Sequence, residues 1–214
     1  MLCISKNFDN SACLCHCLEI MPAPESLGRR AAEDLRFIRN AMARTATFTA
    51  VPGVGGVVMG AIGLVGAVVA SQQPTADRWL GAWLIAAAVA FAGGVVAIVI
   101  KAQRNSLSLD GQISRNFAIG LVAPLAAGAA ITYALWSVRV YSEMPAVWLL
   151  LYGTGVLVGG MFSVGIVRLG GALFMLRGFV AIATPPQFGN LWLGIGFGAL
   201  QIVGGLYIAR KHGG

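Results

Sequence analysis

The sequence predicts an all-α protein, a polytopic membrane bundle of six transmembrane helices preceded by an amphipathic cytoplasmic helix. The first observation is composition, because 57% of the 214 residues are hydrophobic and only 11% are charged, whereas a soluble domain has about 25% charged residues. The second is that the apolar residues form six segments, each close to the roughly 17–25 residues that a spanning helix needs. The 29 glycines lie mostly within these segments, where small residues let helices approach closely.

Residues 1–24 differ from the rest of the chain, because they contain all four cysteines and one of the two histidines. The C-x-C-H-C spacing of Cys13 to Cys17 is too tight for a tetrahedral zinc site, whose paired ligands are separated by two to four residues, so we predict no metal here. Polar residues interrupt the apolar run before it reaches the length of a signal peptide. We interpret this segment as a disordered tail. Met21 is an alternative start that would place residues 1–20 outside the native chain.

Residues 25–46 show the period of an amphipathic helix, with apolar residues on one face and charges on the other. We expect this helix to lie on the cytoplasmic leaflet or to pair with a second copy. Basic residues next to a membrane attract anionic lipid headgroups; alternatively, they only orient the chain. The arginines of this predicted lipid-facing cluster are Arg29, Arg30, Arg36, Arg39 and Arg44.

The remaining residues, 47–214, form the predicted transmembrane domain. The apolar run from residue 146 to 184 is too long for one helix, so a turn must interrupt it, and we place that turn at Arg168. Gly56 and Gly60 form a GxxxG motif, which predicts close helix packing or a homo-oligomer through glycine-rich faces. The six predicted spans are about 48–70, 79–100, 117–138, 146–165, 169–184 and 191–209.

The distribution of basic residues predicts the orientation. With six spans, all lysines and arginines lie on the side of the two termini except Arg78 and Arg139, which lie opposite, and Arg177, which lies inside a span. By the positive-inside rule both termini are cytoplasmic. The tryptophans agree, because all five fall at the non-cytoplasmic ends of their spans, at the headgroup level that indoles favour: Trp79, Trp83, Trp136, Trp148 and Trp192.

The predicted spans contain no Asp, Glu, His or Cys. The usual carriers of proton or sodium coupling are therefore missing, as are ligands for metal hydrolysis and groups for thiol chemistry. We predict no enzyme activity, no cofactor and no metal. The net charge of +7 does not indicate a nucleic-acid partner, since the basic residues lie between apolar runs.

One charge does lie inside a predicted span. Arg177 is near the middle of residues 169–184, and Gln201 on the next helix lies at a similar depth. We hypothesise an intramembrane polar site in which Arg177 binds an anionic headgroup or solute, with Gln201 and Tyr152 orienting it. The alternative is structural, with Arg177 extending toward the interface or capping backbone carbonyls.

Four strings, FTAVPGVGGVVMG, LLYG, GGMFSVGIV and GFGALQIVGGLYIARKHGG, resemble an uncharacterised family of small six-span bacterial inner-membrane proteins. The likeness covers roughly Leu35 to Gly214 and leaves the cysteine-rich tail outside. Its glycine-rich motifs are moderately specific. The resemblance implies six spans and a bacterial inner (plasma) membrane, and it supplies no activity.

The sequence thus favours a non-catalytic membrane protein, an accessory, sensory or structural partner in the lipid bilayer. The alternative is a small oligomeric transporter or channel for a small or anionic solute, with Arg177 and Gln201 near its pathway. A transporter should show a polar stripe along several spans, and only scattered hydroxyl groups are present.

Overall fold

The computed structural model describes residues 35, 53–104 and 111–212. The chain divides into two compact units, Met1–Ala46 and Thr47–Gly214. In the first unit only Leu35 is described; it is helical and exposed. The cysteine-rich tail, the predicted amphipathic helix as a whole and its arginine cluster therefore lie outside the described residues.

The second unit is built from helices alone over the residues that the structure describes, which confirms the all-α prediction. The bundle ends with α8, the π-helix η2 and α9, which follow one another without a break. In chain order the elements are α3 (Gly53–Ser71), α4 (Ala76–Arg104), α5 (Gln112–Ser137), α6 (Met144–Gly160), α7 (Gly165–Ala183), the 3-10 turn η1 (Pro186–Phe188), α8 (Gly189–Leu193), η2 (Gly194–Leu200) and α9 (Gln201–His212).

Five helical stretches of this unit are long and apolar enough to cross a membrane. They are Gly53–Ser71, Ala76–Arg104, Ser114–Ser137, Gly165–Ala183 and Pro186–Lys211. The helix α6 is apolar but shorter, with 17 residues. The predicted segments thus recur as helices, with their ends shifted by a few residues.

The turn between α6 and α7 is not where the charge pattern placed it. The helix α6 ends at Gly160 and α7 begins at Gly165, so Arg168 lies in the first turn of α7 and its assignment to the turn was wrong. The amides of Met161, Phe162 and Ser163 each donate to the carbonyl three residues earlier, at 3.1 Å. These tight bonds end α6 without any polar side chain, because a turn needs only local backbone bonding.

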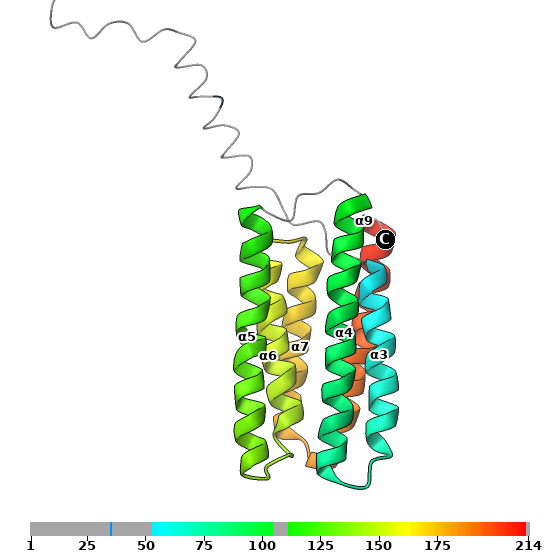
Figure 1. Ribbon diagram of the computed structural model, residues 1–214, viewed down its shortest axis with the longest axis vertical. Helices are drawn as coiled ribbons and strands as arrows, with labels where there is room; N and C mark the ends of the chain where they lie inside the picture. Colours follow the sequence, from blue (N-terminus) through cyan, green and yellow to red (C-terminus); the bar gives the residue numbers. More distant parts are fainter. Residues whose placement is uncertain (1–34, 36–52, 105–110, 213–214) are drawn as a thin grey trace, which may run out of the picture. The chain divides into compact units, whose positions relative to one another are not determined.

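The helices form two groups of three (Figure 1). In one group α3 packs against α4 on one side and against η2 and α9 on the other; in the second, α6 packs between α5 and α7. The groups meet at a buried cluster that includes Trp83, Leu149, Phe174 and Leu193. The loops before α4, between α5 and α6, and before α8 lie together at the lower end of the bundle in Figure 1, opposite the C-terminus.

Glycines set the closest helix contacts. A Cβ atom added to Gly53 would lie 2.2 Å from the backbone nitrogen of Ala209, and one added to Gly63 would lie 2.4 Å from the carbonyl oxygen of Phe197. We call this contact, made by Gly53, Gly56, Gly60 and Gly63 of α3 against η2 and α9, the glycine seam. The same packing joins α6 to α7, where a Cβ on Gly171 would lie 2.4 Å from the amide nitrogen of Leu157. The GxxxG motif therefore packs helices within one chain.

Candidate functional site

All five tryptophans belong to the helix ends that adjoin the loops before α4, between α5 and α6, and before α8: Trp79 and Trp83 at the start of α4, Trp136 at the end of α5, Trp148 near the start of α6 and Trp192 in α8. We call this end of the bundle the tryptophan end. Each indole N–H donates a hydrogen bond to a side chain of the same protein. Trp148 donates to the hydroxyl of Thr132 at 2.8 Å and Trp192 to that of Thr184 at 2.9 Å. Indoles at a membrane surface commonly find partners among water and headgroups, whereas these are fixed by the fold.

Asn190 joins three elements at this end. Its Oδ1 atom accepts from Trp79 Nε1 at 3.2 Å and from Trp83 Nε1 at 2.9 Å, and its Nδ2 donates to the carbonyl of Ala67 at 3.0 Å. One short carboxamide, placed in the first turn of α8, thus holds α4 and α3 together. The stacked rings of Trp79 and Trp148, 5.8 Å apart and 3° from parallel, extend this contact to α6.

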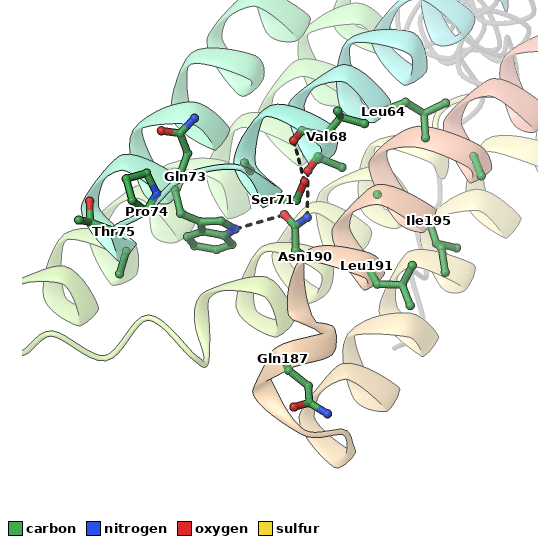
Figure 2. A pocket seen from close by; sticks show the side chains of 16 residues that line it. Leu64, Val68, Ser71, Gln73, Pro74, Thr75, Gln187, Asn190, Leu191 and Ile195 are labelled. Carbon is green, nitrogen blue, oxygen red and sulfur yellow. Dashed lines mark hydrogen bonds between the residues drawn. The ribbon is translucent and has the colours of Figure 1, made fainter.

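Beside Asn190 a groove runs between the end of α3 and the segment formed by α8 and η2 (Figure 2). We call it the lateral groove. Its volume is about 960 Å³, near the upper end of the roughly 300–1,000 Å³ of ligand pockets. Its lining comprises Leu64, Ala67, Val68, Ala70, Ser71, Gln73, Pro74, Thr75, Ala76, Trp79, Gln187, Asn190, Leu191, Gly194, Ile195 and Ala199.

The lining changes from apolar to polar along the groove. Figure 2 shows Leu64 and Val68 on α3, with Ile195 on the facing segment, at some distance from the polar side chains Gln73, Thr75 and Gln187. The polar group belongs to the loops of the tryptophan end. None of the lining residues is charged, so this surface can bind an amphiphile by apolar contact and hydrogen bonding.

A second, smaller cavity of about 350 Å³ adjoins the same residues. It shares Ala76, Trp79, Gln187 and Asn190 with the lateral groove and adds Tyr141 and Ser142 from the loop before α6, among others. The side chains around Asn190 therefore border space on two sides.

An exposed polar cluster links the start of α4 to the end of α5 at this end. Asp77 accepts from the hydroxyl of Tyr141 at 2.6 Å, from the indole of Trp136 at 3.0 Å and from Arg139 at 2.8 Å. The bond from Tyr141, supported by those from Trp136 and Arg139, lowers the pKa of this carboxyl below its ordinary value. Asp77 precedes the apolar part of α4, which begins at Trp79. We call Asp77, Trp136, Arg139 and Tyr141 the polar clasp.

The predicted intramembrane site is assembled only in part. Gln201 Nε2 donates to the hydroxyl of Tyr152 at 3.1 Å, so two of its three residues meet. Arg177 Nη1 donates to the carbonyl of Leu173, four residues earlier on its own helix, at 3.2 Å. This bond matches the structural alternative, and binding of an anion by Arg177 stays a prediction.

The surroundings of Tyr152 are aromatic. Its ring lies 4.7 Å from that of Phe174 and 5.0 Å from that of Phe197, both in edge-on geometry. Phe197 belongs to the π-helix η2, and Gln201 follows its last residue directly. The wider turn of a π-helix is frequent at functional sites. Here it borders both the Gln201–Tyr152 pair and the lateral groove.

Sequence reasoning missed Asn190 and the groove. Asn190 is the one amide side chain next to the tryptophan-containing start of the last helix, which was a weak signal for a polar contact. Its partners come from α3 and α4, more than a hundred residues away along the chain. In the part of the chain that the structure describes, no group of three or more His, Cys, Asp or Glu residues could hold a metal.

A comparison of the chain with protein-family models, curated proteins and solved structures finds no match. Any function proposed for this chain therefore depends on its own sequence and geometry.

Proposed function

We propose that this chain is a multi-pass integral membrane protein that crosses the bilayer six times and acts without catalysis, through contacts made within the bilayer. The observation that supports this proposal most strongly is the surface of the bundle, where large apolar side chains point outward along the helices. Ile85 on α4 is 67% exposed and Val65 on α3 is 63% exposed. A monomeric soluble protein rarely exposes apolar patches above a few hundred Å², so hydrocarbon is the solvent that fits this surface.

The proposed sixth crossing is α6. At 1.5 Å per residue, its 17 residues extend about 26 Å, slightly less than the roughly 30 Å hydrocarbon core. Local thinning of the bilayer compensates a difference of this size at modest cost. The antiparallel order of α5, α6 and α7 in Figure 1 is the order that a crossing by α6 requires.

The charges support an orientation with the tryptophan end outside. Near the opposite end of the bundle lie the basic residues Lys101, Arg104, Arg115, Arg168, Arg210 and Lys211. Only Arg78 and Arg139 accompany the tryptophans among the described residues. The positive-inside rule then favours both termini in the cytoplasm. A bacterial inner membrane, as the family resemblance implies, is part of this proposal.

The alternative of a transporter receives less support. The polar pair in the middle of the bundle, Gln201 and Tyr152, is bonded to itself and bordered by the rings of Phe174 and Phe197. A homo-oligomer would use faces other than the glycine seam. Open positions exist on α4, where Cβ atoms added to Gly81 and Gly93 would meet nothing within 4 Å.

Reporter fusions test the crossings and the orientation. An alkaline phosphatase or fluorescent protein fused after Gln73, Ser108 or Gln187 should report outside, inside and outside respectively. Any other pattern rules out six crossings with cytoplasmic termini. Solute uptake by vesicles containing the purified protein, above that of empty vesicles, would instead support the transporter.

A further inference from the structure

We propose that the lateral groove binds one acyl chain of a zwitterionic phospholipid, whose headgroup is held by the uncharged polar side chains at the tryptophan end. The inference rests on the proposed membrane function, because the lipid must reach the groove from the bilayer. It adds to that function a specific site, a ligand class and a depth in the membrane.

The groove exists because its floor is made of small residues. Ala67 of α3 faces Gly194, where a Cβ atom would lie 3.1 Å from that of Ala67, and the small residue Ala70 also lines the groove. The helices therefore touch at the floor and leave room above it. Asn190 closes the floor at one end and holds α3 through the carbonyl of Ala67 at 3.0 Å. The groove is therefore formed by the contact between α3 and the segment of α8 and η2.

The walls of the groove open toward the outside of the bundle. Val68 is 58% exposed and Leu191 is 54% exposed, and both line the groove (Figure 2). In a bilayer this surface faces hydrocarbon. An acyl chain can then enter sideways and bury methylene groups against the walls, while the rest of the lipid stays in the leaflet.

The polar end of the groove is suited to a headgroup without net charge. Gln73, Thr75 and Gln187 offer carboxamide and hydroxyl groups, and no lining residue is charged. A carboxamide both donates and accepts, so it can bond the phosphate and the ammonium of a zwitterionic headgroup. Of the charges near this end, Asp77 and Arg139 are paired with each other at 2.8 Å. Arg78 is exposed and, although its backbone N–H bonds to the hydroxyl of Thr75, it is not part of the lining. An anionic headgroup would find no cation in the lining.

Two wall residues on the same helix provide a matched test. Val68 lines the groove, whereas Val65, 63% exposed on α3, does not. Val68→Trp places a large side chain over the groove, and Val65→Trp places the same side chain on the neighbouring lipid-facing surface. Neither site is buried, so both variants should fold. Gln187→Leu removes a polar group at the headgroup end, with Gln72→Leu, an exposed position outside the lining, as its control.

The experiment is native mass spectrometry of the full chain in detergent micelles, with added phosphatidylethanolamine or phosphatidylglycerol of the same acyl chains. The wild type and Val65→Trp should retain one phosphatidylethanolamine per chain in a saturable manner. Val68→Trp should weaken its binding by about tenfold or more. Gln187→Leu should weaken it by several-fold, and Gln72→Leu should leave it unchanged.

Equal retention of lipid by Val68→Trp and Val65→Trp would overturn the proposal. So would a preference for phosphatidylglycerol, which would assign the bound lipid to a basic surface elsewhere. Masses of a dimer that disappear only in Val68→Trp would instead identify a second copy as the occupant. The reporter fusions, repeated on each variant, separate these results from failure of the membrane proposal. If a variant loses bound lipid while its reporter fusions still read outside, inside, outside, the result bears on the groove and leaves the proposed membrane topology intact.

Discussion

The glycine seam and the lateral groove are two parts of one helix contact, and they are built in opposite ways. In the seam, α3 approaches η2 and α9 so closely that a Cβ on Gly63 would lie 2.4 Å from a backbone oxygen. In the groove, α3 meets the same last segment through the small residues Ala67 and Gly194 and through the carboxamide of Asn190. The seam leaves no room for a side chain, whereas the groove leaves about 960 Å³.

The two regions tolerate different substitutions. Dispersion between close backbones stabilises the seam, so added volume is costly there. Hydrogen bonds join the helices at the groove, so removing a polar side chain there lowers the stability of the fold. Four measurements test this distinction.

The largest effect is expected for Gly63→Ala in the seam. The methyl group would meet the carbonyl of Phe197, and since a backbone cannot yield as a side chain does, we expect about 3 kcal/mol of destabilisation. Thermal unfolding in detergent micelles measures it. Gly93→Ala on α4 is the control, because its methyl group meets open space and should stabilise the helix by up to about 1 kcal/mol. Equal losses at both sites would contradict the packing described for the seam.

Asn190→Leu in the groove should cost about 2 kcal/mol, because two indole N–H groups and the carbonyl of Ala67 lose their partner. Tryptophan emission should change together with the unfolding temperature, since Trp79 and Trp83 are both affected. Asn116→Leu is the matched control, as that side chain bonds only to Gln112 within its own helix among the described contacts. An unchanged unfolding temperature for Asn190→Leu would show that Asn190 does not stabilise the contact between α3, α4 and α8.

Next to η2, Gln201 and Tyr152 should be coupled by about 1 kcal/mol. The test is a double-mutant cycle of Gln201→Leu and Tyr152→Phe, followed by thermal unfolding. Tyr152→Phe keeps the ring contacts with Phe174 and Phe197, so the cycle isolates the bond at 3.1 Å. A parallel cycle with Tyr207→Phe, an exposed residue that contacts Lys211, should give no coupling. Additive effects in both cycles would mean that the bond contributes nothing.

The smallest effect is expected at the polar clasp, which is open to solvent. Because its bonds lower the pKa of Asp77 below the ordinary 3.8, the ionised carboxylate stabilises the folded state above that pH. This contribution is lost as the pH falls through the lowered, folded-state pKa. The unfolding temperature of Asp77→Asn should therefore lie below that of the wild type at pH 7, and the two should converge below pH 3.8. Glu143→Gln is the control carboxylate at the same end. A difference that does not change with pH would exclude ionisation as its cause.

The helices were predictable because each apolar run carries its own length and composition. The position of the turn after α6 was not, since three backbone bonds in an apolar stretch formed it without the charge at Arg168. The depth argument paired Gln201 with Arg177, whereas the side chain of Gln201 bonds to Tyr152 and that of Arg177 to a carbonyl of its own helix. Asn190 was not expected, because a lone asparagine says nothing about which distant indoles will reach it.

The all-helical class, the apolar segments and the grouping of tryptophans and basic residues at opposite ends of them follow from the amino-acid sequence alone. These properties are local, since each depends on residues within one segment. The tertiary structure was needed to show that the glycines of α3 pack against the last helix of the same chain. It also showed that this contact opens into a groove beyond Leu64. The reason is that a helix presents several faces, and the partner of each face depends on how distant segments pack together.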